Sequence, residues 1–171
     1  AHVAGVGAES ELGHFGVGEI YAVGGIAALT QPDEAVRYVK ETGVDCLAVA
    51  IGSAHGVYKG EPKLRLDLLK ELAGKVPVPL VLHGGSGTGD ENLATACRLG
   101  ISKVNVANDL FRGAYNKIQA VGMEGNNIYA LMPMLHEGYK ETAKHFIKIL
   151  GCAVKAWTAE TYVSSSLKQA S

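Results

Sequence analysis

Two histidines occupy matching places in the sequence, each shortly after an apolar segment and each directly before a glycine. His55 follows the segment 44–51, and His83 follows the segment 80–82. Neutral imidazole is a common zinc ligand, and a catalytic zinc takes about three protein ligands while one coordination position stays open. The two side chains alone leave three interpretations open: metal ligands, general acids, or histidines with a structural role.

Glycines accompany both histidines. Gly56 follows the first of them, and Gly84 and Gly85 separate His83 from Ser86. Because glycine has no Cβ, the backbone N–H groups of such a segment can approach phosphate oxygens closely, and the Ser86 hydroxyl can add a donor. Tight turns between a strand and a helix explain the same glycines equally well. The glycines are therefore compatible with phosphate binding but do not establish it.

Two glutamates, Glu9 and Glu11, lie near the end of the first predicted strand. Residues two apart in an extended segment point to the same side of the strand, so we expect the two carboxylates to lie together. Without other information, solvated carboxylates at a strand end are the simplest interpretation of this pair.

The elements that must position these residues alternate between strands and helices, at about the spacing of a βαβ unit. Strands are expected at 3–12, 44–51, 80–82 and 103–106, and helices at 30–43 with Thr30 as N-cap, at 63–73, 90–99 and 132–150, and from 108 onward. Polar and glycine-rich residues follow every predicted strand, at the end where parallel sheets place ligand sites. A complete (β/α)₈ barrel needs about 250 residues. The 171 residues therefore predict either half a barrel or an open sheet.

The overall composition excludes several classes of function. Lys and Arg number 16 against 17 Asp and Glu, so no broad positive field attracts nucleic acid or an anionic membrane surface. No apolar run approaches the roughly 18 residues of a membrane span. The three cysteines, Cys46, Cys97 and Cys152, are far apart and form no C-x-x-C pair, which favours reduced thiols in the cytoplasm. We therefore expect a cytoplasmic protein without nucleic-acid or membrane partners.

Four segments around these residues resemble signatures of the class II fructose- and tagatose-bisphosphate aldolases, which are zinc enzymes with a (β/α)₈ TIM barrel. They read ESELG at 9–13, AIGSAHGVYKG at 50–60, PLVLHGGSG at 79–87 and SKVNVAND at 102–109. The resemblance runs from about residue 3 to 155 and places the segments in the family's order. It implies an α/β fold in which 1–155 form the C-terminal half of the barrel, about the last four βα units plus C-terminal helices, and 156–171 form a tail.

The resemblance also implies site residues. The metal ligands would be His55 and His83, with Glu11 as a ligand when the zinc moves away from its active position. The substrate and its phosphate would contact Gly56, Lys59, Gly84, Gly85, Ser86, Asn105, Val106, Ala107 and Asn108. The implied cofactor is Zn²⁺, with a monovalent cation as a possible second ion. The implied partners are a phosphorylated ketose, dihydroxyacetone phosphate and further copies of the chain in a dimer or tetramer.

The implied activity is the reversible cleavage of a fructose- or tagatose-1,6-bisphosphate-type substrate into dihydroxyacetone phosphate and an aldehyde. Zinc would polarise the ketose carbonyl and stabilise the enediolate that remains after the carbon-carbon bond breaks. No lysine that forms a Schiff base is needed. The acidic run of the family's mobile loop is reduced to Glu19, which leaves that residue as the one catalytic candidate in this sequence.

The sequence departs from the family at its general base. The family carries an aspartate beside the third zinc-binding histidine, and no Asp-His pair occurs in this sequence. Asn108 also replaces a usual threonine. We therefore expect a fragment of a longer protein, and the other explanation is a truncated relative that pairs with another chain. Two other functions stay open: a non-catalytic phosphosugar-binding half-barrel, and an unrelated α/β phosphate-binding protein without zinc.

Overall fold

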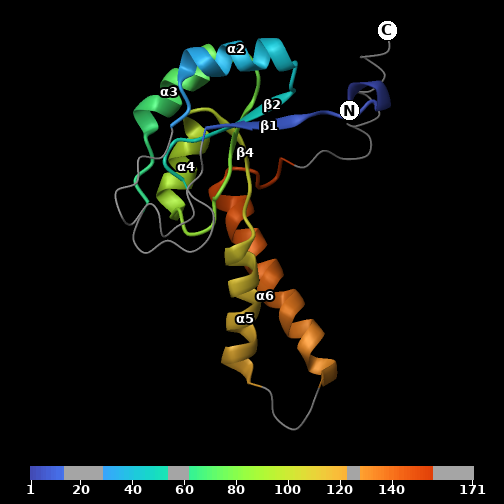
Figure 1. Cartoon of the computed structure of the whole chain (residues 1–171). Helices are drawn as coiled ribbons and strands as arrows, with labels where there is room; N and C mark the ends of the chain where they lie inside the picture. The colour runs from blue at the N-terminus through green and yellow to red at the C-terminus, as the bar shows by residue number, and fades with distance from the viewer. Residues whose placement is uncertain (14–28, 54–61, 123–127, 156–171) are drawn as a thin grey trace.

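A four-stranded parallel sheet forms the centre of the part of the chain that the structure describes (Figure 1). The computed structural model describes residues 1–13, 29–53, 62–122 and 128–155. The strands are β1 (Glu9–Leu12), β2 (Cys46–Val49), β3 (Leu80–Leu82) and β4 (Ile101–Val104), hydrogen-bonded in the order β1-β2-β3-β4. The connecting helices are α2 (Pro32–Thr42), α3 (Leu66–Lys75) and α4 (Asp90–Arg98), and every strand pair is parallel. The predicted strand-helix repeat is confirmed.

The first connecting helix shows how the sequence sets its boundaries. Pro32 occupies the first turn of α2, where its missing N–H costs no hydrogen bond, and Asp33 and Glu34 complement the positive end of the helix dipole. Gly43 ends the helix with φ 67°, a left-handed conformation that glycine adopts without strain. The predicted end of this helix is therefore confirmed.

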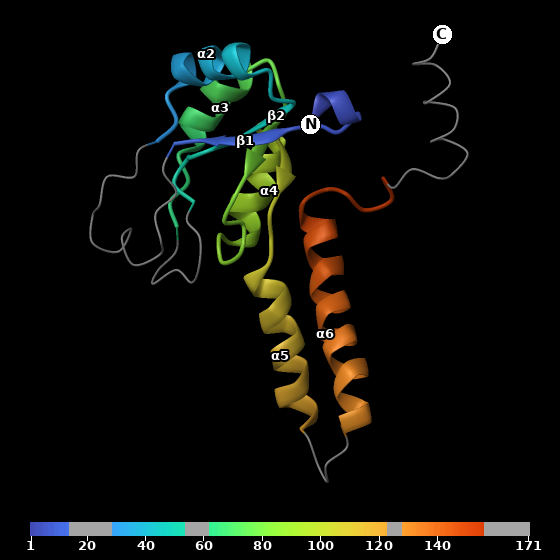
Figure 2. The same ribbon diagram turned by 45° about the vertical axis from the view of Figure 1, so that its right-hand side comes forward.

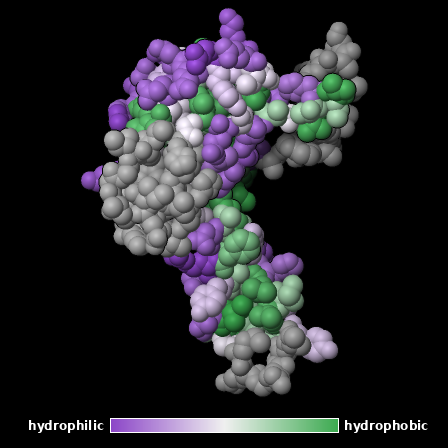
Figure 3. Space-filling view, viewed as in Figure 1, coloured by the Kyte–Doolittle hydropathy of each residue, from purple (hydrophilic) through white to green (hydrophobic). Residues whose placement is uncertain are grey.

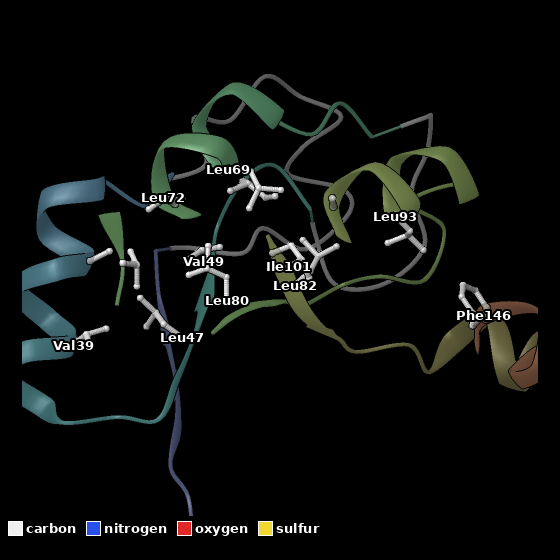
Figure 4. Packing of buried hydrophobic residues seen from close by; sticks show 14 residues of the cluster. Val39, Leu47, Val49, Leu69, Leu72, Leu80, Leu82, Leu93, Ile101 and Phe146 are labelled. Carbon is white, nitrogen blue, oxygen red and sulfur yellow. The ribbon is translucent and has the colours of Figure 1, made fainter. Parts of the chain in front are cut away.

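One face of the sheet carries the hydrophobic core (Figure 4). Leu47 and Leu80 are adjacent in the register of β2 and β3, and both are buried. Val49 and Leu82 continue this face, which the helices cover with side chains such as Leu69. Burial of a side chain of this size stabilises the fold by about 1.5–3 kcal/mol. The core therefore fixes which side of each strand faces the helices.

The opposite face carries the polar side chains. The register aligns Glu11 with Ala48, Ala48 with Val81, and Val81 with Lys103, and residues in one row of a sheet point to the same face. Ala48 and Val81 are fully buried, whereas the two ends of the row are charged. The polar face thus has small residues in its centre and ionisable side chains at its edges.

The last two helices form a hairpin that projects from the α/β body (Figure 2). They are α5 (Asn108–Val121) and α6 (Ile128–Ile149). A Cβ added to Gly138 would lie 2.6 Å from the Gly113 carbonyl oxygen, so the two backbones approach too closely for a larger residue. The rings of Phe111 and Tyr139 meet edge to face with centroids 5.9 Å apart. These contacts hold the two helices together where residues 111–113 of α5 meet residues 138–139 of α6.

Apolar side chains remain exposed on the hairpin, as Figure 3 shows. They include Phe111 and Tyr115 on α5, and Tyr129 and Met132 on α6. No helix within the described ranges is long and apolar enough to cross a membrane.

Several local predictions are wrong. Among the helices, α3 begins at Leu66 rather than at residue 63, and α6 begins at Ile128 rather than at residue 132. The first strand covers only β1, because the glycine-containing start of the chain forms a 3-10 turn (His2–Ala4) that ends at Gly5 with φ 66°. Thr30 is not the N-cap of α2; Gln31 is, without a side-chain cap. The Thr30 hydroxyl instead donates to the Leu12 carbonyl and accepts from the Ala50 N–H. The fourth strand begins at Ile101, two residues before its predicted start, because the Ile101 side chain packs in the core. It also ends two residues before its predicted end.

Candidate active site

The His83 imidazole lies between two carboxylates at the end of the sheet. Strand β1 directs both glutamates to the polar face, and His83 follows β3 directly. Its Nδ1 lies 2.6 Å from Glu11 Oε2, and its Nε2 lies 2.9 Å from Glu9 Oε1. The His83 side chain is 15% exposed, whereas those of Glu9 and Glu11 are 28% and 39% exposed, so the carboxylates lie at the solvent side of the ring. The two carboxylates fix the plane of the ring from opposite sides.

Lys103 extends this group of side chains across the sheet. Its Nζ donates to Glu9 Oε2 at 2.8 Å and to Asn105 Oδ1 at 2.8 Å. The Lys103 ammonium, and to a lesser extent the His83 imidazole, holds the pKa of Glu9 below its usual range. The Cys46 thiol lies 3.5 Å from the same carboxylate, and burial together with this negative charge raises its pKa. Glu9 is therefore a fixed anion that joins β1 to β4.

A glycine-rich turn after β3 meets the start of α5. Ser86 is 7% exposed, and its hydroxyl oxygen accepts from the backbone N–H groups of Ala107 and Asp109, both at 3.2 Å. The Gly87 N–H donates to the Asp109 carboxylate at 2.8 Å. A Cβ on Gly85 would lie 2.9 Å from the Asn105 carbonyl oxygen, so only glycine fits between the two segments. The turn and the helix start are held together by hydrogen bonds between backbone N–H groups and the side chains of Ser86 and Asp109.

The structure brings several of the predicted site residues together. Glu11 and His83 are in contact. The predicted phosphate-binding residues in the described ranges come from the turn after β3 and from the segment that leads from β4 to the first residue of α5. They are Gly84, Gly85, Ser86, Asn105, Val106, Ala107 and Asn108. His55, Gly56, Lys59 and Glu19 lie outside the described residues. Their roles stay predictions.

The group around His83 does not by itself form a metal site in the described residues. Within them, no group of three or more His, Cys, Asp or Glu side chains is placed to hold one metal ion. The chemistry of the group around His83 nevertheless suits zinc, because imidazole nitrogen and carboxylate oxygen are both zinc ligands. Two glutamates beside one histidine also match the arrangement in which a carboxylate orients a metal-binding imidazole.

Two members of this group, Glu9 and Lys103, were not predicted as site residues. Each lies two positions before a predicted site residue on the same strand or its extension, at the spacing that puts side chains on one face. That spacing is the signal that could have identified them. The spacing could not reveal that Glu9 and Lys103 contact each other. The two residues are 94 positions apart in the sequence, and two other strands lie between β1 and β4 in the sheet.

The comparisons with known proteins place these residues in a family. The family model described as fructose-bisphosphate aldolase class-II matches residues 1–155. This chain belongs to the class II fructose-bisphosphate aldolase family. The uncharacterized protein YdjI of Escherichia coli strain K12 is 40% identical to this chain over 163 residues. The matched region covers 91% of this chain and 55% of YdjI.

Solved structures of aldolases agree with the half-barrel architecture. The crystal structure of the YdjI aldolase from Escherichia coli K12 superposes with a TM-score of 0.77 at 37% identity, over 91% of this chain and 53% of that one. The fructose-bisphosphate aldolase of Campylobacter jejuni superposes with a TM-score of 0.70 over 88% of this chain and 53% of that one. Its 20% identity supports the shared fold alone. The chain spans about half the length of these relatives.

Proposed function

We propose that the complete natural protein containing this chain is a zinc-dependent ketose-bisphosphate aldolase. It reversibly cleaves a fructose- or tagatose-1,6-bisphosphate-type substrate into dihydroxyacetone phosphate and an aldehyde. The observation that supports this most is the position of His83, whose ring contacts Glu9 and Glu11 beside a glycine-rich turn, in a chain of the class II aldolase family.

Three residues of this chain would hold the zinc. His55 and His83 are the proposed ligands in the active position, and Glu11 is the proposed ligand in a second position. A bound zinc supplies Lewis-acid polarisation of the substrate carbonyl. The Glu9 carboxylate orients the His83 imidazole through Nε2, 2.9 Å away, and Nδ1, which lies 2.6 Å from Glu11, is the nitrogen proposed to face the zinc. Glu19 is proposed to take part in proton transfer.

The glycine-rich turn would hold the substrate phosphate. We assign this role to Gly56, Lys59, Gly84, Gly85, Ser86, Val106, Ala107 and Asn108, and we assign the substrate hydroxyls to Asn105. Backbone N–H groups at the start of a long helix favour an anion, because the helix dipole places partial positive charge there. The hydrogen bonds from Ala107 and Asp109 to Ser86 hold the turn at the start of α5.

The remaining proposals concern partners and location. Phosphorylated ketoses and dihydroxyacetone phosphate are the proposed ligands, and a homo-oligomer is the proposed assembly. The three cysteines are free thiols in the structure, which is consistent with a cytoplasmic protein.

An activity assay tests the main proposal. The complete protein, loaded with zinc, is mixed separately with fructose-1,6-bisphosphate and tagatose-1,6-bisphosphate, and dihydroxyacetone phosphate is measured with a coupled dehydrogenase. We expect product from at least one substrate, loss of product after chelation, and recovery when zinc is added back. Absence of product from both substrates would rule out this activity.

A second candidate is a non-catalytic half-barrel that binds phosphosugars. The absence of any Asp-His pair in this sequence favours it, because the family places its base and third ligand there. Calorimetry of the 171-residue chain with dihydroxyacetone phosphate, together with its mass in solution, tests this candidate. Binding by a folded oligomer without cleavage would support it, whereas an aggregated chain that binds nothing would contradict it.

A further inference from the structure

An irregularity in the sheet directs Lys103 to the polar face. In the register of β3 and β4, Leu80 pairs with Ile101, but the next residue, Val81, pairs with Lys103 rather than with Ser102. Without this bulge, Ile101 and Lys103 would lie on the same face, because side chains alternate along a strand. With it, Ile101 is 5% exposed in the core while Lys103 shares the row of Glu11. Bulges of this kind often reorient a side chain beside an active site.

The Lys103 ammonium then bonds to two residues of the proposed site. It lies 2.8 Å from Glu9 Oε2 and 2.8 Å from Asn105 Oδ1. Through the other carboxylate oxygen of Glu9 it is linked to His83 Nε2. One cation therefore connects the strand that carries the glutamates, the histidine after β3 and the asparagine after β4.

The chemistry of the ammonium determines the orientation of Asn105. Lysine can only donate hydrogen bonds, so the amide oxygen of Asn105 must face it. The amide NH₂ group is then turned away from Lys103, where it can donate to an oxygen of a ligand. A rotated amide would place NH₂ against the ammonium and would offer the ligand an acceptor instead of a donor.

The same ammonium also distinguishes the two glutamates. Glu9 is held by Lys103 at one oxygen and faces His83 Nε2 with the other. Glu11 contacts His83 Nδ1 and is the more exposed of the two, at 39% against 28%. A metal-binding imidazole usually donates from its second nitrogen to a carboxylate, which fixes its orientation. Glu9 suits that role, and Nδ1 is then the nitrogen that faces the metal.

We infer that Lys103 is a positioning residue, which holds Glu9 against Nε2 of His83 and fixes the amide orientation of Asn105. The inference rests on the proposed zinc aldolase function. Lys103 touches neither metal nor substrate in this assignment and acts only through the two side chains that it binds.

The test compares variants of the complete protein in two separate measurements. Zinc affinity is measured by competition with a chelator, and kcat and KM are measured at saturating zinc. For Lys103→Met we expect a zinc dissociation constant about tenfold higher and a KM for the ketose bisphosphate raised by a similar factor, at the lower end of the ~10–100-fold range for residues that support metal ligands. Lys103→Arg should recover most of both losses, because guanidinium also donates to two acceptors.

Two further variants make the test specific. Lys75→Met is the matched control, since Lys75 also binds two carboxylates, those of Asp33 and Glu71, but lies on α3 away from His83. It should leave zinc affinity and KM unchanged. Glu9→Gln should weaken zinc binding as Lys103→Met does. The double variant should bind zinc no more weakly than either single variant, because both substitutions remove the same interaction, that between Lys103 and Glu9.

The two hypotheses fail in different ways. A wild-type protein that cleaves substrate, with a Lys103→Met variant within twofold of it in zinc affinity and KM, would overturn the inference alone. A wild-type protein that binds zinc but cleaves neither substrate would overturn the proposed function. Tenfold weaker zinc binding by Lys103→Met would still support the positioning role in that case, because the affinity measurement does not depend on turnover.

Discussion

Glu11 and His83 are 72 residues apart in the sequence, yet Glu11 Oε2 lies 2.6 Å from His83 Nδ1. The contact exists because β1 and β3 are both parallel to β2, so the ends of the two strands meet at the same edge of the sheet. A negative charge next to a nitrogen that can bind a cation strengthens the attraction of the site for divalent metals.

Replacement of Glu11 by glutamine tests this charge. We expect Glu11→Gln to bind zinc about tenfold more weakly, because the neutral amide keeps the size of the side chain but loses its negative charge. Chelator competition on the complete protein measures the change, and Glu34→Gln on the exposed surface of α2 is the control. Unchanged zinc affinity in Glu11→Gln would contradict a metal-binding role for Glu11.

Removal of the His83 imidazole should be more severe. We expect His83→Ala to lose bound zinc and to lose activity by more than the ~10–100-fold that is typical of supporting residues. His145→Ala serves as the control, since His145 is on α6 and binds Asp90 at 3.0 Å. Metal analysis after gel filtration measures occupancy, and full occupancy in His83→Ala would exclude His83 as a ligand.

Thr30 joins the ends of two strands, and its loss should destabilise the fold. Its side chain is 1% exposed and bonds to the Leu12 carbonyl and the Ala50 N–H. Thr30→Val keeps the shape but leaves both groups without this partner, which costs about 1–3 kcal/mol of unfolding free energy. Thr30→Ser keeps the hydroxyl and should lose less. Urea unfolding measures the free energy of unfolding of both variants. An equal loss of stability in Thr30→Val and Thr30→Ser would show that the missing hydroxyl does not cause the destabilisation.

The close approach of α5 and α6 predicts an effect at Gly138. A Cβ there would lie 2.6 Å from the Gly113 carbonyl oxygen and 2.8 Å from the Ala114 Cα, and neither backbone atom can move freely. We expect Gly138→Ala to destabilise the protein by about 1–3 kcal/mol, as for other overpacked sites.

The same substitution in α3 provides the control for Gly138. No heavy atom lies within 4 Å of a Cβ added to Gly74, so Gly74→Ala should gain up to about 1 kcal/mol from helix propensity. Thermal unfolding compares the two variants. Equal stability changes of the same sign would contradict the close helix contact.

Acid should weaken the start of α3 through Asp67. Its hydrogen bond from Arg65, followed by that from the Leu68 N–H, lowers the pKa of this carboxyl to about 2. A carboxyl whose pKa is depressed by folding contributes stability that is complete above its ordinary value of 3.8 and is lost as the pH falls toward about 2. Asp67→Asn should therefore unfold with a weaker pH dependence between these values. An unchanged acid-unfolding curve would contradict the contribution.

The central strands were predictable because their sequences are simple. β2 and β3 are almost continuously apolar and buried on both faces, as strands in the middle of a parallel sheet must be. Gly43 likewise marked the end of α2, since no other residue adopts its left-handed conformation as readily. Local composition alone was sufficient for these elements.

β4 was placed two residues too late for a physical reason. Its sequence alternates poorly, because the bulge at Ser102 interrupts the period of two between Ile101 and Lys103. A bulge is defined by how β4 pairs with β3, and the sequence of β4 alone carries no information on that pairing. The contact between Lys103 and Glu9 was missed for the same reason, and so was the hydroxyl of Thr30, whose partners come from two other segments.

The row between Glu11 and Lys103 has a consequence for the substitutions that the site can accept. Its two middle positions are Ala48 and Val81, both small and fully buried, so they form the floor over which the charged side chains meet. Because Ala48 is 0% exposed, a bulkier residue there would have no free space and would displace the side chains packed above it. A change at this one apolar position can therefore disturb the geometry of the charged side chains without removing any of them.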